Sequence, residues 1–130
     1  MINQTLATEL YYGKALDVLK AIVPPQRHVV VITDNNILRL YPTLVTSYNY
    51  IAIESGEGSK DMGCVMDIFD KLMSMGADRS TLLIGIGGGV VTDITGFVAS
   101  TYMRGVEFGF VSTTLLGQVD ASIGGKNGVN

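Results

Sequence analysis

Four short apolar runs recur along the chain, at residues 29–33, 50–53, 81–86 and 108–112, and none of them alternates with polar residues. Runs of this kind are typical of strands that are buried on both faces of a parallel sheet. Stretches with helical periodicity separate them. The pattern therefore predicts an α/β fold, a Rossmann-like parallel sheet with helices on both faces.

Apolar residues spaced by three and four predict helices at residues 13–22, 60–75 and 90–98. In the 60–75 helix they form one stripe that we expect to pack in the core: Met62, Val65, Met66, Phe69, Leu72 and Met73. Ser59 is expected to cap this helix and Gly76 to end it, with Asp67 pairing with Lys71. Asp34 or one of the two asparagines that follow it is expected to cap a shorter helix after the first strand, and this helix must stop before Pro42.

Three successive glycines, at residues 87–89, join the third predicted strand to the next helix. Backbone N–H groups at such a junction can turn toward a phosphate, and the helix dipole favours an anion there. A tight packing turn is the alternative. The usual dinucleotide fingerprint G-x-G-x-x-G is absent, because Val90 and Thr92 stand where its last glycine would be needed.

The loops that follow parallel strands meet at one edge of the sheet, where ligands of such folds bind. This edge is expected to collect Asp34, Glu57 and the three glycines. Asp93, expected in the first turn of the following helix, either stabilises that helix or accepts from a ligand hydroxyl. Glu57 and Lys60 either hold a ribose and a phosphate or are solvated surface residues.

The segment 120–130 sets Asp120, Lys126 and Asn130 among three glycines with almost no other charge nearby. A lysine in such surroundings can hold a phosphate, meet a carboxylate or shift its pKa toward a catalytic range. The alternative is a mobile tail. Eleven of the 16 glycines lie between residues 85 and 130, which indicates that the chemistry is concentrated in this part of the chain.

Composition narrows the function classes. A single cysteine excludes an internal disulfide, and a single histidine, His28, leaves no pair for a metal site, so no metal ligand is expected in this chain. The net charge of −3 argues against a nucleic-acid partner. No signal peptide or membrane-length apolar run is recognisable, and we expect a cytoplasmic location without membrane contact.

Residues 85–105, GIGGGVVTDITGFVASTYMRG, and 112–130, STTLLGQVDASIGGKNGVN, closely resemble 3-dehydroquinate synthases, members of the sugar-phosphate cyclase superfamily. The ITDNN segment at 32–36 and SGEGSK at 55–60 extend the resemblance over about residues 29–130. Thr92 departs from the pattern, since the family commonly has glycine there.

The resemblance implies a lyase of the shikimate pathway, and so of aromatic amino acid biosynthesis. Such enzymes convert 3-deoxy-D-arabino-heptulosonate 7-phosphate, a phosphorylated sugar acid, into 3-dehydroquinate and phosphate. Bound NAD⁺ transiently oxidises a ring hydroxyl, which lets phosphate leave. The family joins an N-terminal NAD-binding α/β domain to a helical domain with catalytic zinc, and is expected to form homodimers.

The glutamate and two histidines that bind zinc in the family belong to sequence after Asn130. Residues 1–130 are therefore expected to be the NAD-binding domain of a two-domain enzyme, truncated and inactive alone. Zinc or another divalent metal is expected only in the full-length enzyme. The reading frame downstream of Asn130 would test this.

The resemblance also implies roles for individual residues. Those that match the family's NAD-binding segments are Asp34, Asn36, Glu57, Lys60, Gly88, Gly89, Val90, Asp93, Thr113, Thr114 and Lys126. Those that match its catalytic and substrate-facing positions are Asp120, Lys126, Asn130 and Arg104. The family arginine that Arg104 resembles reaches the substrate phosphate across a dimer interface.

Two enzyme alternatives remain open: another sugar-phosphate cyclase, and a metal-dependent polyol dehydrogenase, which also uses a GGG…D loop. From a different class, the chain could be a stand-alone nucleotide-binding or interaction module with no reaction of its own. Calorimetry with NAD⁺ and ADP-ribose tests this, because binding of neither ligand would favour a purely structural module.

Overall fold

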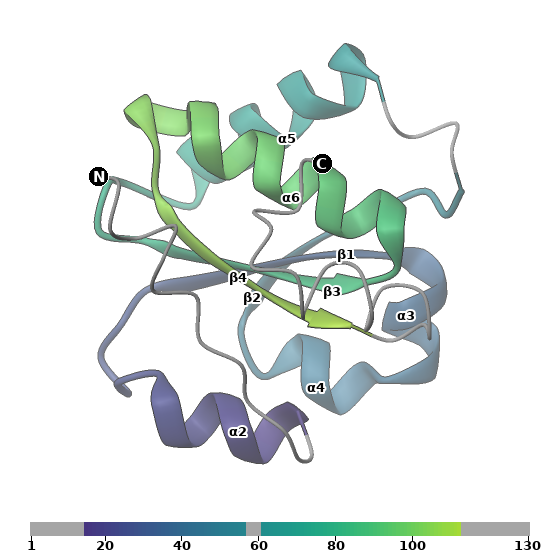
Figure 1. The fold of residues 1–130 in the computed structure, drawn as a ribbon, viewed down its shortest axis with the longest axis vertical. Coiled ribbons are helices and arrows are strands. Elements are labelled where there is room, and N and C mark those ends of the chain that lie inside the picture. Colours follow the sequence, from purple (N-terminus) through teal and green to yellow (C-terminus); the bar gives the residue numbers. More distant parts are fainter. Residues whose placement is uncertain (1–14, 57–60, 113–130) are drawn as a thin grey trace.

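The computed structural model describes residues 15–56 and 61–112. In this part of the chain four parallel strands form one sheet in the order β2-β1-β3-β4 (Figure 1). They are β1 Val29–Asp34, β2 Asn49–Ile53, β3 Leu82–Gly87 and β4 Glu107–Ser112. The predicted α/β fold with a parallel sheet is confirmed.

Helices cover both faces of the sheet (Figure 1). One face carries α5 Met62–Ser74 and α6 Gly89–Thr101, and the other carries α2 Ala15–Ile22, α3 Asn35–Leu40 and α4 Pro42–Thr46. Helix α4 was not expected. Proline at its first position explains it, because the missing N–H of proline is not needed in a first turn.

Alternate residues of each strand face opposite layers, and both layers are apolar. Val30 and Ile32 of β1 pack with α5 and α6, whereas Val29 and Val31 pack with α2, α3 and α4. Both faces of β1 are therefore buried, which is the physical reason why its sequence does not alternate.

Two of the predicted helix boundaries are confirmed and one is wrong. Asp34 caps α3 by accepting from the backbone N–H of Ile37 at 2.8 Å, and Gly76 follows α5 with a φ of +74°. The N-cap of α5 is Asp61, not Ser59, because the Asp61 carboxylate accepts from the N–H of Cys64 at 2.8 Å. The helix therefore begins at Met62.

The prediction that all six apolar residues of α5 face the core is wrong. The buried side chains are Val65, Ile68 and Leu72, while Met62, Met66 and Met73 are 58, 52 and 58% exposed. The buried set is spaced by three and four and the methionines by four and seven, and both spacings keep residues on one side of a helix, so the period alone does not say which set lies inward. The branched side chains are the buried ones. The predicted Asp67–Lys71 pair is present, at 3.0 Å.

These two sides of α5 give a stability prediction. Truncating the fully buried Ile68 to alanine is expected to lower the free energy of unfolding by about 2–5 kcal/mol, since it leaves a cavity. The matched control, Met66→Ala on the exposed side, is expected to change it by less than about 0.5 kcal/mol. Urea unfolding followed by circular dichroism measures both. Similar losses at the two positions would contradict the burial pattern.

Candidate functional site

The strand order places a topological switch point at the carboxyl ends of β1 and β3, an edge position called the crevice in sheets of this type. From β1 the chain moves to β2 on one side and then to β3 on the other, so the connections diverge between β1 and β3. In sheets of this type, ligands bind at such a switch point. Helix α3 begins directly after β1, and α6 begins directly after β3, so both helices start at this edge of the sheet (Figure 1).

Asp34 ends β1 and is half-buried at the crevice. Its Oδ1 accepts from Ile37, so one carboxylate oxygen is committed to the first turn of α3. Asn36 is exposed, and its Oδ1 accepts from the guanidinium of Arg39. Both predicted residues therefore lie at the ligand edge, on a helix start that their own hydrogen bonds hold in place.

Hydrogen bonds tie the end of β1 to the end of β2. The amide Nδ2 of Asn35 donates to Glu54 Oε2 at 3.0 Å, and the backbone N–H of Asn36 donates to Ser55 Oγ at 3.3 Å. Asn35, Glu54 and Ser55 shape this edge but were not predicted to do so. Their position directly after two adjacent strands was the signal that could have identified them.

The three glycines have different roles. Gly87 is the last residue of β3, and a Cβ there would lie 2.8 Å from Cγ2 and 2.9 Å from Cβ of Val91 in α6. Gly88 is the N-cap of α6, and Gly89, its first residue, would place a Cβ in open space. Gly87 thus serves close packing, whereas Gly89 leaves the end of the helix accessible.

The N-terminus of α6 is the strongest anion-binding feature of this edge. Its N-cap makes no side-chain hydrogen bond to the first turn within the part of the chain that the structure describes. The N–H groups of a first turn have no partner inside the helix, and together with the dipole they attract a phosphate. Helix α6 has thirteen residues, the length of an ordinary helix, so its N-terminus carries the usual helix dipole.

Val90 and Asp93 follow on the same helix. Val90 is half-buried and its side chain packs against the core under α5 and α6, while its contact with NAD stays a prediction. The expectation that Asp93 lies in the first turn is wrong, because α6 begins at Gly89 and Asp93 is its fifth residue. Asp93 is half-buried one turn above the helix end.

Arg104 does not join the other predicted residues. It ends the 3₁₀ segment η2 Tyr102–Arg104, which follows α6 at the amino end of β4 (Figure 1). The thirteen residues of α6 separate it from Gly88 by about 20 Å, at 1.5 Å per residue. Within one chain, Arg104 therefore lies at the opposite edge of the sheet from the crevice.

The remaining predicted site residues lie outside the described ranges: Glu57, Lys60, Thr113, Thr114, Asp120, Lys126 and Asn130. Their roles stay predictions. Among residues 15–56 and 61–112, no three His, Cys, Asp or Glu side chains come together as a metal site. Over the same residues, no helix has the length and apolarity needed to span a membrane.

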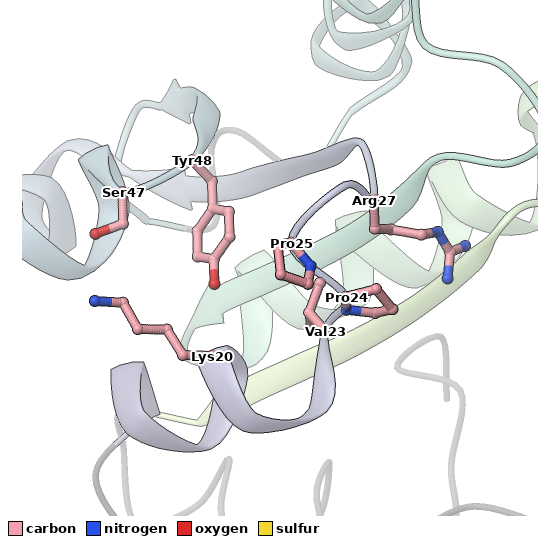
Figure 2. Close-up of a pocket in the computed structure, with 7 residues that line it drawn as sticks. All are labelled: Lys20, Val23, Pro24, Pro25, Arg27, Ser47 and Tyr48. Carbon is pink, nitrogen blue, oxygen red and sulfur yellow. The ribbon is translucent and has the colours of Figure 1, made fainter.

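A pocket of about 430 Å³ lies at the other edge of the sheet, where β1 and β2 begin (Figure 2). Lys20, Pro25 and Tyr48 line it, and the Tyr48 hydroxyl points into it. The guanidinium of Arg27, on the rim, is held by the Ser80 carbonyl at 2.8 Å and by Glu107 at 2.9 Å. The pocket is thus separate from the crevice.

Comparison with solved structures supports this architecture. A 2-deoxy-scyllo-inosose synthase matches with a TM-score of 0.71 at 21% identity, over 84% of this chain and 33% of that one, which shows the fold. The 2-epi-5-epi-valiolone synthase from Streptomyces hygroscopicus subsp. jinggangensis, solved with NAD⁺ and Zn²⁺ bound, matches at 0.67 and 28% identity. That match covers 79% of this chain and 32% of the synthase.

Sequence comparison is more specific. The 3-dehydroquinate synthase of Pyrococcus furiosus is 48% identical over 120 residues, which cover 88% of this chain and 35% of that protein. The chain spans about a third of the length of the curated relatives it matches. The family described as 3-dehydroquinate synthase N-terminal matches residues 50–130, more than half of the chain. The chain belongs to the 3-dehydroquinate synthase family and corresponds to its N-terminal region.

Proposed function

We propose that this chain is the NAD-binding domain of a cytoplasmic 3-dehydroquinate synthase. The whole enzyme, meaning this chain with the remaining length of its relatives, would convert 3-deoxy-D-arabino-heptulosonate 7-phosphate into 3-dehydroquinate and phosphate. The observation that carries the proposal is the accessible N-terminus of α6 at the β1/β3 switch point, in a chain of this family.

The described residues fit a dinucleotide. The open space at Gly89 and the N–H groups after Gly88 suit a pyrophosphate, because no side chain of α6 blocks its approach. Asp34 Oδ1 is committed to Ile37, which leaves Oδ2 to accept from an adenosine ribose hydroxyl. Asn36 follows two residues after Asp34, and Asp93, one turn along α6, would meet the nicotinamide ribose.

Residues outside the described ranges complete the proposed site by resemblance. Glu57 and Lys60 would hold the adenosine ribose and its phosphate, with Thr113 and Thr114 beside the pyrophosphate. Asp120, Lys126 and Asn130 would face the substrate and the nicotinamide.

NAD⁺, when bound, supplies a hydride acceptor for the transient oxidation of the substrate. The residues of this chain bind and orient that cofactor. By resemblance, the metal of the whole enzyme would be held by a glutamate and two histidines that do not belong to this chain.

We further propose that Arg104 serves the site of a second copy in a homodimer. Its position about 20 Å from the N-terminus of α6 excludes it from the crevice of its own chain. A guanidinium is well matched to a phosphate, because its donors bind two oxygens at once.

The whole enzyme tests the proposed function. It is expected to release phosphate and form 3-dehydroquinate from the heptulosonate phosphate, and to lose this activity when NAD⁺ is stripped. Turnover of only a different sugar phosphate would place it among other cyclases. The 130-residue chain is expected to bind NAD⁺ weakly by calorimetry and to show no turnover. Binding of neither NAD⁺ nor ADP-ribose at millimolar ligand would favour a structural module.

A further inference from the structure

The turn that carries Arg104 has an unusual backbone. Met103 and Arg104 have φ values of +49° and +69°, and they precede Gly105 at +108°. Left-handed conformations are uncommon for bulky residues and cost free energy, so two in succession persist only where surrounding contacts impose them. Strained backbone of this kind is concentrated at functional sites.

Tyr102 supplies the contacts that impose this turn. Its side chain is buried at 6% exposure, and its hydroxyl donates to the backbone carbonyl of Ala77 at 2.8 Å. Its ring packs against Phe69 of α5, with the centroids 5.9 Å apart. Burial and the nearby Asp78 raise the pKa of Tyr102 above its usual value, which already keeps the hydroxyl protonated and able to donate at neutral pH.

Backbone hydrogen bonds on either side of the strained pair close the turn. The N–H of Gly105 donates to the Tyr102 carbonyl at 2.8 Å, and the N–H of Val106 donates to the Ala99 carbonyl at 2.7 Å. Met103 and Arg104 are themselves exposed, and no carboxylate within residues 15–56 and 61–112 pairs with the guanidinium. The contacts of Tyr102 that hold the turn are therefore buried, whereas Arg104 itself is exposed.

We propose that Tyr102 is a positioning residue for Arg104: its buried hydroxyl bond to Ala77 holds the left-handed turn in the geometry in which Arg104 binds the substrate phosphate. This inference rests on the proposed function. Arg104 contacts the substrate, whereas Tyr102 acts only through the turn. Pre-organising a guanidinium in this way lowers the entropy lost when it binds an anion.

A double-mutant cycle in the whole enzyme tests the proposal. Tyr102→Phe keeps the ring and removes the hydroxyl, and is expected to raise the KM for the phosphorylated substrate about fivefold, the factor that one net hydrogen bond represents, with kcat within about twofold. Arg104→Ala is expected to raise this KM at least about tenfold. In the Arg104→Ala background, Tyr102→Phe should change nothing further.

The matched control is Tyr48→Phe, a tyrosine whose hydroxyl points into the separate pocket of Figure 2, and it should leave both constants unchanged. Equal effects of Tyr102→Phe with and without Arg104 would show a general structural role and overturn the proposal. An unchanged KM in Arg104→Ala would overturn it as well.

Amide hydrogen exchange separates this inference from the proposed function. In Tyr102→Phe the amides of Gly105 and Val106 are expected to exchange about fivefold faster while the core strands are unchanged. If these two amides exchange faster but the enzyme has no 3-dehydroquinate synthase activity, the proposed function is refuted, while the role of the Tyr102 hydroxyl in holding the turn is supported. Unchanged exchange at both amides would refute that role of Tyr102.

Discussion

Gly89→Asp is expected to lower the affinity of the whole enzyme for NAD⁺ by at least about a hundredfold without destabilising the fold. The added carboxylate stands at the first position of α6, in space that the structure leaves open. It would compete for the N–H groups that we assign to the pyrophosphate, and it would repel the negative charge of the pyrophosphate. Several charge-assisted hydrogen bonds, worth about 1.5–3 kcal/mol each, would be weakened or lost. The same carboxylate stabilises the helix dipole by about 0.3–1 kcal/mol.

Affinity and stability should therefore change in opposite directions, which separates loss of a binding site from loss of structure. Isothermal calorimetry and thermal unfolding measure the two quantities. Gly89→Asn is the matched control, because it has the same shape without the charge and should retain more affinity. NAD⁺ affinity unaffected by Gly89→Asp would show that the N-terminus of α6 is not the phosphate site.

Gly85→Ala is expected to cost about 3 kcal/mol or more of unfolding free energy, at or above the usual upper limit for overpacking. A Cβ at Gly85 would lie 2.5 Å from Oγ1 and 3.0 Å from Cβ of Thr95. Thr95 is fully buried, and its hydroxyl donates to the Val91 carbonyl at 2.8 Å, so it has no free direction in which to move. The strand and α6 would have to separate.

Two variants make this measurement specific. Thr95→Ala removes the hydroxyl and methyl groups that the new Cβ meets. The double variant Gly85→Ala/Thr95→Ala should therefore have an unfolding free energy at least about 1 kcal/mol higher than the sum of the two single effects predicts. Gly109→Ala in the neighbouring strand meets only Ile84 Cδ1, at an ordinary 3.5 Å, and should change stability by less than about 1 kcal/mol. A loss at Gly109 as large as that at Gly85 would contradict the close approach.

The sheet could be predicted from the sequence because a strand that is buried on both faces has apolar residues at successive positions. Val30 and Val31 point to opposite layers and are both fully buried, so neither position tolerates a polar side chain. The helix that follows β1 was predictable for a similarly local reason, since Asp34 reaches an N–H only three residues away.

Features set by tertiary packing were not predictable. The period of α5 fits its exposed methionines as well as Val65, Ile68 and Leu72, and only contact with the sheet selects the inner set. Arg104 is sixteen residues from Gly88 in sequence, and α6 places the two at opposite edges of the sheet. The left-handed φ of Met103 goes against residue preference, because Tyr102 and Gly105 impose it from outside.

The close seating of α6 on β3 also bears on motion. Seven of its thirteen residues are buried, and the bare backbone of Gly85 and Gly87 leaves no gap across which the helix could tilt or rotate alone. We therefore expect β3, α6 and the turn that carries Arg104 to move as one rigid unit. In the proposed enzyme, opening or closing around NAD⁺ would therefore use hinges in other segments, and Arg104 would keep a constant distance from the N-terminus of α6 in its own chain.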